Sequence, residues 1–413
     1  METKTAAIEM RNITKRFGPV LANDKVWLNI YRGEILALLG ENGSGKTTLM
    51  NMLSGIYFPD EGEIKIDGKE VVIRSPKDAF DNGIGMIHQH FKLVDVLTAA
   101  ENIVLGLPGK LDLKAASAKI REICDKYGFS VDPAQKIYDM SVSQKQTVEI
   151  VKVLYRGADI LILDEPTAVL TPQETDKLFA VLRNMRNDGK AIVIITHKMH
   201  EVEALSDRVA ILRHGQFIGD MLTAHTNAQE MTNMMVGHAV SLNIERPDPV
   251  DPKPRIEVKG LTVRSVDGIV KLDDVSFTAN SGEILGIAGI SGCGQKELLE
   301  AIAGLQTVES GSISYIEDDG SRDELIGKDP LSIAELGVSL SFVPEDRLGM
   351  GLVGNMNLAD NMMLRSFRRG KSIFTDRRSP RALAESVVQE LSVSTPSVDT
   401  PVRRLSGGNV QKV

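Results

Sequence analysis

The stretch that decides the fold is GENGSGKTT, residues 40–48. It lies between the apolar runs EILALL (34–39) and LMNML (49–53), so the sequence predicts a strand, a glycine-rich turn and the start of a helix. The turn fits the pattern G-x-x-x-x-G-K-[ST] through four residues, Gly40, Gly45, Lys46 and Thr47. In such a turn the backbone N–H groups receive phosphate, the lysine reaches the β- and γ-phosphates and the threonine hydroxyl can bind Mg²⁺. We therefore predict a triphosphate site with Mg²⁺; the alternative is a glycine-rich turn that binds nothing.

Residues beside this pattern complete the predicted nucleotide site. Three of them, Asn42, Gly43 and Thr48, belong to the turn itself. A fourth, Phe17, precedes the turn and can either stack on adenine or belong to the core. The sequence leaves both readings of Phe17 open.

Acidic and polar residues end three later apolar runs. The run Ile160–Leu163 ends in Asp164 and Glu165. Asp164 can hold Mg²⁺ directly or through water, and Glu165 can orient or deprotonate the attacking water. His197 follows the run AIVII, and Gln89 follows GMIH. We expect His197 to contact the γ-phosphate and the Gln89 amide to approach the metal or the water, although a lone histidine in such a place is more often structural.

Length and charge limit the class of protein. A chain of 413 residues is longer than one hydrophobic core usually serves, so we expect two domains. The net charge of −8 and the pI near 5.5 argue against an extended basic face for nucleic acid. No apolar run reaches the roughly 18 residues of a membrane span, and the start METK opens no signal-peptide core. We therefore expect a cytoplasmic protein without a nucleic-acid partner.

An internal repeat gives the domain organisation. GEIL at 33–36 recurs at 282–285, and IEMRNIT at 8–14 has the counterpart IEVKGLT at 256–262. Between the copies lies ERPDPVDPKP, whose four prolines favour an extended connection. Short apolar runs that alternate with helical stretches such as Asp176–Arg186 indicate buried parallel strands. We predict three parts, which are a first domain over residues 1–244, a linker over 245–254 and a second domain over 255–413.

Together these motifs resemble the nucleotide-binding subunits of ATP-binding-cassette (ABC) transporters, over nearly the whole chain. The resemblance implies tandem P-loop ATPase domains of the α/β class. Each would have a mainly parallel sheet core, an antiparallel β subdomain and a helical subdomain. In this family the 40–48 turn is the Walker A loop, and the strand ending at Asp164 is Walker B, with the catalytic Glu165 beside it. Gln89 and His197 resemble the Q-loop and H-loop residues.

The second copy adds LSGGN at 405–409, which resembles the signature motif of the family. The resemblance implies that Ser406, Gly407 and Gly408 complete the ATP site of a neighbouring cassette. Two cassettes in one chain, with PEDR at 344–347, are similar to the ATPases of ribose/galactose-type and nucleoside-type bacterial importers. The stretch HQHFKLV at 88–94 looks closer to the nucleoside branch, although nothing in an ATPase subunit touches the solute.

The second copy departs from the family pattern at its own phosphate loop, GISGCGQK at 289–296. Gln295 stands at the lysine position and Lys296 at the Ser/Thr position. A neutral amide cannot offset phosphate charge. Lys296 lies one step along the helix, roughly 100° round, so we expect it not to replace Lys46.

The first copy departs from the pattern at its signature, MSVSQ at 140–144. Val142 and Ser143 stand where the family has two glycines, so side chains occupy the approach to phosphate. Sites of this family resemble head-to-tail composites, in which one cassette's loop faces the other's signature. Both defects would then fall in one site, and Lys46 would face the intact LSGGN.

The given sequence ends at Val413, a few residues after LSGGN. We therefore expect the second domain to be C-terminally incomplete, without a Walker B strand or H-loop of its own. We also expect the chain as given to bind ATP through its first cassette and to hydrolyse it poorly, because a signature helix this short attracts phosphate weakly.

The resemblance implies a Mg²⁺-dependent ATP hydrolase that energises import of a nucleoside or a simple sugar. Its partners would be membrane-spanning permease subunits and, through them, a solute-binding protein, with the ATPase peripheral to the inner face of the cell membrane. One alternative is a soluble two-cassette ATPase that acts on ribosomes or nucleic acid. That class predicts two intact loops, a long charged linker and basic faces. The other alternative is an ATP-binding fragment that does not hydrolyse.

Overall fold

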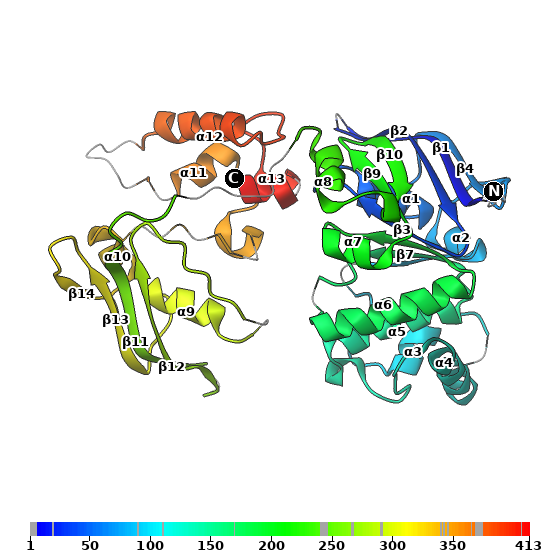
Figure 1. Ribbon diagram of the computed structural model, residues 1–413, viewed down its shortest axis with the longest axis horizontal. Coiled ribbons are helices and arrows are strands. Elements are labelled where there is room, and N and C mark those ends of the chain that lie inside the picture. Colours follow the sequence, from blue (N-terminus) through cyan, green and yellow to red (C-terminus); the bar gives the residue numbers. More distant parts are fainter. Residues whose placement is uncertain are drawn as a thin grey trace. The chain divides into compact units, whose positions relative to one another are not determined.

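The computed structural model divides by its internal contacts into two compact units. Met1–Leu242 and Arg404–Lys412 form the first unit, and Asn243–Arg403 with Val413 form the second. The structure describes residues 6–413 except 19, 89–90, 110, 169, 240–246, 266–267, 290–291, 339–340, 342, 345–346, 365, 368–374 and 406. Figure 1 shows the elements of both units, each of which is treated by itself below.

The first unit is built on a six-stranded sheet with the strand order β10-β9-β3-β8-β7-β6. The strands are β3 Glu34–Leu39, β6 Ile84–Ile87, β7 Ile160–Asp164, β8 Ala191–Ile195, β9 Arg208–Arg213 and β10 Gln216–Leu222. All neighbours pair in parallel except β10, which runs antiparallel to β9. Every residue of β3, β7 and β8 is buried, as their continuous apolar runs predict for strands covered on both faces.

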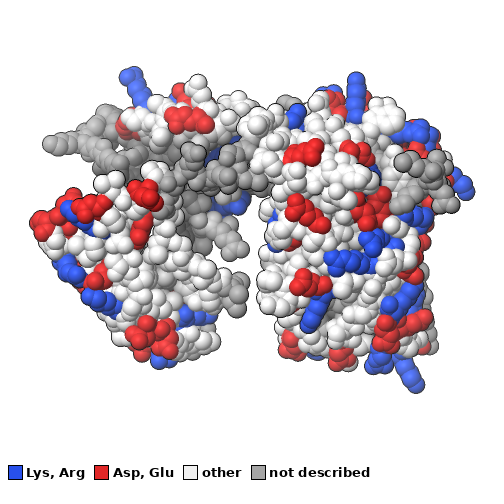
Figure 2. All heavy atoms as spheres, in the orientation of Figure 1, with Lys and Arg blue, Asp and Glu red and all other residues white. Residues whose placement is uncertain are grey.

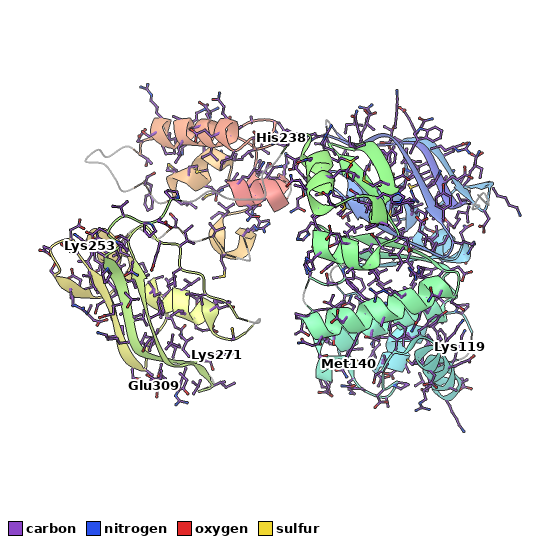
Figure 3. The ribbon with its side chains drawn as sticks, viewed as in Figure 1. Lys119, Met140, His238, Lys253, Lys271 and Glu309 are labelled. Carbon is purple, nitrogen blue, oxygen red and sulfur yellow. The ribbon has the colours of Figure 1, made fainter. Side chains whose placement is uncertain are left out.

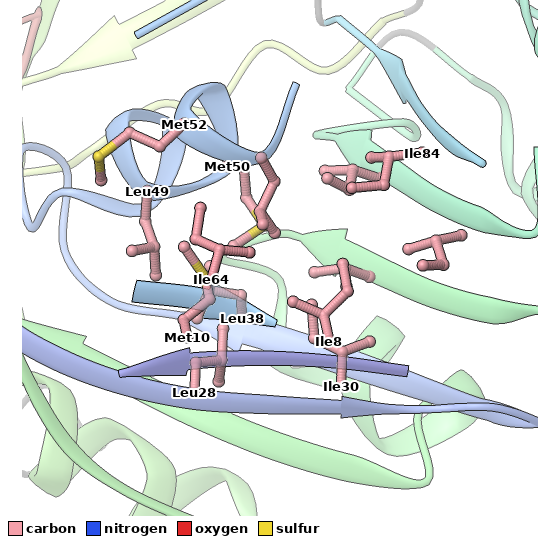
Figure 4. Close-up of a cluster of buried hydrophobic side chains, with 14 of the residues drawn as sticks. Ile8, Met10, Leu28, Ile30, Leu38, Leu49, Met50, Met52, Ile64 and Ile84 are labelled. Carbon is pink, nitrogen blue, oxygen red and sulfur yellow. The ribbon is translucent and has the colours of Figure 1, made fainter. Parts of the chain in front are cut away.

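An antiparallel sheet of order β2-β1-β4-β5 packs on the same core. Its strands are β1 Ala6–Phe17, β2 Val20–Tyr31, β4 Glu61–Ile66 and β5 Lys69–Val71. Between the two sheets lies α1, Lys46–Leu53, whose Leu49, Met50, Met52 and Leu53 are fully buried (Figure 4). Burying four large side chains here stabilises the helix that the phosphate loop begins, at roughly 1.5–3 kcal/mol for each.

Helices cover the parallel sheet and form a separate helical group. Those beside the sheet are α2 Pro76–Asp81, α6 Pro172–Asn187, α7 Met199–Leu205 and α8 Ala228–Val236. The helical group holds α3 Ala99–Val104, α4 Leu113–Tyr127, the 3₁₀ turn η1 Ile137–Asp139 and α5 Val142–Tyr155, near Lys119 and Met140 in Figure 3. Helix α6 begins earlier than predicted, because Thr171 caps it in a capping box with Glu174.

The second unit repeats the antiparallel sheet in the order β12-β11-β13-β14. Its strands are β11 Pro254–Arg264, β12 Val270–Asn280, β13 Ser310–Ile316 and β14 Arg322–Glu324. Its helices are α9 Gln295–Ile302, α10 Pro330–Glu335, the π-helix η3 Arg347–Gly351, α11 Leu358–Met363, α12 Arg378–Glu390 and the 3₁₀ turn η4 Val402–Arg404 at the unit's edge. Ile256 pairs with Tyr315 much as Ile8 pairs with Ile66, so the structure confirms the internal repeat.

The two copies differ at the strand before the loop. In the first unit β3 is buried between β8 and β9. Residues 283–289 form no strand, and the side chains of Ile284 and Ile287 are 78% and 42% exposed. A strand needs neighbours for its N–H and C=O groups, and the described residues of the second unit pair only in an antiparallel sheet.

Charge is mixed on the surface. On the face of the first unit shown in Figure 2, acidic and basic side chains are interspersed. Among the described residues, no helix has both the length and the apolar character needed to cross a bilayer.

Candidate nucleotide site

The turn at 40–48 needs glycine at two positions. Gly40 has φ +154° and Gly45 has φ +95°. A Cβ on Gly40 would lie 2.2 Å from the Leu212 carbonyl oxygen, and one on Gly45 would lie 2.3 Å from the Ala22 carbonyl oxygen. Both positions therefore combine a backbone conformation that favours glycine with a backbone contact that excludes any side chain.

Lys46 is the first residue of α1 and is buried. Its Nζ donates to the carbonyl oxygens of Gly40, at 2.7 Å, and Glu41, at 2.9 Å. Burial lowers the pKa of Lys46, and the carboxylates of Glu165, Asp164 and Glu41 oppose that shift. The ammonium thus sits inside the turn with its charge poorly solvated, which favours binding of an anion there.

Thr47 of α1 and Asp164 at the end of β7 contact each other beside the loop. Thr47 Oγ1 donates to Asp164 Oδ2 at 3.2 Å. Burial raises the pKa of Asp164, and the hydrogen bond from Thr47 works against it. Hydroxyl and carboxylate oxygens are the ligands that Mg²⁺ prefers, and a divalent cation would favour the charged carboxylate. This pair fits Mg²⁺.

Glu165 and His197 are brought together by the pairing of β7 with β8. Asp164 pairs with Ile195, so the residues that follow each strand end lie side by side. His197 Nδ1 lies 3.0 Å from Glu165 Oε1. Glu165 has φ +46°, a left-handed conformation that costs a non-glycine residue about 1–3 kcal/mol and is concentrated at functional sites.

A cavity of about 390 Å³ lies over the loop and falls within the size range of ligand sites. Nine of the predicted site residues line it, namely Phe17, Asn42, Gly43, Gly45, Lys46, Thr47, Thr48, Asp164 and Glu165. Phe17 is 41% exposed and packs edge to face on Tyr57, with ring centroids 5.1 Å apart. It therefore lies on the cavity wall and not in the core. A buried lysine, a helix that no described side chain caps and a pair of hard oxygen ligands fit a triphosphate with Mg²⁺.

The remaining residues predicted to bind from the Q-loop and the signature are not among the described residues that line this cavity, although a Cβ on Gly408 would lie 3.3 Å from Asn42 Cβ, and Asn42 does line it. Gln89 and Ser406 lie outside the described residues. Gly407 and Gly408 begin α13, Gly407–Lys412, a helix that belongs to the first unit by its contacts. The assignment of these four residues to the site stays a prediction.

Sequence reasoning missed the residues that support the loop from behind. Asn23 on β2 is fully buried, and its Nδ2 donates to the Gly45 carbonyl oxygen at 3.3 Å. Its Oδ1 has no hydrogen-bond partner among the described residues. Ala22 presses on Gly45 from the same strand. The stretch VLANDKV (20–26) shows no alternation of apolar and polar residues, so the local sequence gives no sign of this support.

The second copy keeps the glycine conformation at the end of the loop without the lysine that follows it. Gly294 has φ +98° and precedes α9, and a Cβ there would lie 2.4 Å from the carbonyl oxygen of Lys271, labelled in Figure 3. Gln295 Nε2 donates to the Ile287 carbonyl oxygen at 3.0 Å. Lys296 is exposed and pairs with Glu300 one turn along the helix, at 3.7 Å. As predicted, Lys296 does not take the place of Lys46.

Comparison with known families agrees with this geometry. A family model described as ABC transporter matches residues 23–168 and 272–413, once for each copy. The chain belongs to the ABC transporter family. The two matched ranges are two cassettes of this family, and the 40–48 turn lies in the first of them.

Relatives and solved structures extend the comparison. The nucleoside import ATP-binding protein NupA of Lactococcus lactis subsp. cremoris is 44% identical over 98% of this chain and 80% of its own length. The glucose import ATP-binding protein TsgD13 of Haloferax volcanii is 41% identical over 100% of this chain and 80% of its own length. A structure of MJ1267, an ATP-binding cassette of an ABC transporter, has a TM-score of 0.51 with 23% identity, and covers 57% of this chain and 99% of its own. That structure supports the fold alone.

Proposed function

We propose that this chain is an ATP-hydrolysing subunit that energises import of a solute through membrane permease partners. The observation that carries the proposal is the single cavity in which Lys46, Thr47, Asp164 and Glu165 meet, in a chain of the ABC transporter family. Because only the first loop keeps the lysine, hydrolysis is assigned to the first cassette.

The residues of the cavity divide the work of phosphoryl transfer. Backbone N–H groups of the turn and Lys46 Nζ hold the phosphates and offset their charge. Glu165 Oε1, beside His197 Nδ1, accepts or orients the proton of the attacking water. Mg²⁺, held by Thr47 and Asp164, would supply charge neutralisation at the transferring phosphoryl group. Phe17 supplies an aromatic face on the cavity wall for adenine.

The signature LSGGN at 405–409 is proposed to complete this site. The paired defects support the assignment, since Gln295 and the side chains of Val142 and Ser143 then fall together in the other composite site. In the described structure Ser141 caps α5 and Val142 is 44% exposed, so a branched side chain stands at the start of that helix. Ser406, Gly407 and Gly408 would bind the phosphates held by Lys46.

We further propose that the chain is cytoplasmic and lies on the inner face of the cell membrane. The segment before α3 carries exposed apolar side chains suited to a permease, namely Val94 and Val96, which are 41% and 66% exposed. Through the permease the chain would serve a solute-binding protein. The acidic net charge and the single intact loop favour this function over action on ribosomes or nucleic acid.

A nucleoside is the proposed solute, and a simple sugar is the second candidate. The stretch HQHFKLV at 88–94 and the 44% identity to NupA favour the nucleoside, while the 41% identity to TsgD13 keeps the sugar in contention. The test is uptake of labelled nucleoside and of labelled glucose and ribose in cells of the source organism that lack the chain, with and without its return. We expect only nucleoside uptake to be lost and restored. Loss of sugar uptake alone would select the second candidate, and loss of neither would overturn the import function.

A further inference from the structure

Two side chains of α5 hold the backbone of Lys92 at both of its polar groups. The Lys92 N–H donates to Glu149 Oε1 at 2.6 Å, and the Lys92 carbonyl oxygen accepts from Lys152 Nζ at 3.1 Å. Glu149 and Lys152 also form an ion pair of 3.4 Å with each other. Glu149 is only 6% exposed, and hydrogen bonds to a charged, buried acceptor are among the stronger ones. Side chains of α5 thus satisfy both the N–H and the carbonyl oxygen of Lys92, as the backbone of a neighbouring strand would.

Asn102 of α3 holds Val94 in the same manner. The Val94 N–H donates to Asn102 Oδ1 at 2.7 Å, and the Val94 carbonyl oxygen accepts from Asn102 Nδ2 at 3.1 Å. Nδ2 also donates to the Thr98 carbonyl oxygen at 3.0 Å. Asn102 is 1% exposed, whereas the side chains of Val94 and Val96 reach solvent. The backbone is therefore fixed from inside while apolar side chains face out.

The second cassette repeats the asparagine part of this arrangement. Asn361 of α11 accepts from the Val353 N–H at 2.8 Å and donates to the Val353 carbonyl oxygen at 3.2 Å. Its Nδ2 also donates to the Asn357 carbonyl oxygen at 2.9 Å. Both copies have the same three contacts, so the arrangement is not peculiar to one loop.

Further contacts tie the segment to the same helical group. The Tyr138 N–H donates to the Asp95 carbonyl oxygen and the Ile137 N–H to the Leu97 carbonyl oxygen, both at 3.1 Å. Lys145 of α5 pairs with the Asp95 side chain at 3.3 Å. Residues 92–97 are therefore bonded to α3, α5 and η1 at successive positions. Helices α3, α4 and α5 lie together in Figure 1.

We propose that Glu149, Lys152 and Asn102 are positioning residues that make residues 92–96 move as one body with α3 and α5. Displacement of α5, the helix that begins within MSVSQ, then carries the exposed Val94 and Val96 with it. The inference rests on the proposed function in one respect, since ATP is taken to drive that displacement. None of the three residues touches the nucleotide cavity.

The first test is hydrogen exchange at the Lys92 amide in the full chain. Glu149→Ala is expected to speed exchange there about 10- to 100-fold, the factor for losing one hydrogen bond to a charged acceptor. Glu149→Gln keeps an acceptor and is expected to restore most of the protection. Glu122→Ala, on an exposed position of α4, is the control and leaves exchange unchanged. If hydrogen exchange at the Lys92 amide is unchanged in Glu149→Ala, Glu149 does not hold this backbone and the proposal is overturned.

The second test separates positioning from mere folding. Spin labels are placed at Val96→Cys and Arg121→Cys, each measured against Lys69→Cys on β5 in a Cys293→Ser background. On addition of Mg-ATP both distances are expected to shift, and in the double variant Glu149→Ala, Asn102→Ala the Val96 shift is expected to fall while the Arg121 shift remains. A shift at Arg121 without any shift at Val96, before any substitution at Glu149, would overturn the proposal. If neither distance shifts, ATP does not drive the movement that the proposed function assumes. The exchange result then still decides whether Glu149 holds the backbone of Lys92.

Discussion

The two phosphate loops of this chain end in the same glycine conformation and carry different side chains. Gly45 and Gly294 have φ +95° and +98°, and each precedes a helix of eight residues, α1 and α9. Each glycine is pressed by a carbonyl oxygen of the neighbouring antiparallel sheet, from Ala22 in one copy and Lys271 in the other. In both copies the glycine before the helix therefore serves close packing against the neighbouring sheet, independently of any ligand.

The side chains on that shared backbone differ at every charged position. Lys46 is buried in its turn, whereas its counterpart Gln295 offers a neutral amide to the Ile287 carbonyl oxygen. Glu297 stands in the first turn of α9, where α1 has Thr48. A carboxylate near phosphate repels it, so the second loop opposes the anion that the first attracts. We therefore expect a glycine of this conformation before the helix not to suffice for phosphate binding.

The largest expected effect on ATP turnover comes from replacing Glu165, the carboxylate proposed to act on the attacking water. Glu165→Gln is expected to lower ATP turnover about 10³-fold, within the range for removing a general base, and to leave ATP binding intact. The measurement is phosphate release with Mg-ATP at saturation. Glu297→Gln on the second loop is the matched control, and we expect it to leave turnover unchanged. Similar losses in both variants would break the comparison.

The shared glycines give the next effect. Gly45→Ala forces a Cβ against the Ala22 carbonyl oxygen at positive φ and is expected to weaken ATP binding at least about tenfold. Gly294→Ala meets an equal clash with Lys271 but is expected to lower only the thermal stability of the second unit. Equilibrium binding and thermal melting of both variants measure this. Loss of ATP affinity in Gly294→Ala would show that the second loop takes part.

The smallest effect on ATP binding is expected from replacing Phe17, the aromatic side chain that lines the cavity. Phe17→Ala is expected to weaken ATP binding about two- to tenfold, the range for one aromatic stacking contact. The second copy has Ser265 at the corresponding position, and Ser265→Ala is expected to change nothing. If Phe17→Ala binds ATP as well as the unsubstituted chain, the ring serves only to pack on Tyr57.

Much of this could be predicted from the sequence because apolar runs and loop spacing are local signals. The runs before Gly40, at Ile160–Leu163 and at 191–195 all became buried parallel strands. The sequence also put Glu165 and His197 each after an apolar run, whereas the contact between their side chains was not predicted and comes from the pairing of β7 with β8. The position of Lys296, one residue after the lysine position of the pattern, predicted that its side chain points away from the loop, and the structure pairs it with Glu300.

Other features could not be predicted, since they depend on residues far apart in the chain. Asn23 supports Gly45 from 22 positions away, and Glu149 reaches Lys92 across 57. The left-handed backbone of Glu165 has no sign in the residues around it. The early start of α6 could have been predicted, because Thr171 and Glu174 have the spacing of a capping box.

The central claim is that only the first loop holds triphosphate. The most direct test is titration of the full chain with ATP and Mg²⁺, comparing Lys46→Ala with Gln295→Ala. We expect one site in the unsubstituted chain, with binding lost in Lys46→Ala and unaltered in Gln295→Ala. Binding that survives Lys46→Ala and disappears in Gln295→Ala would contradict the account.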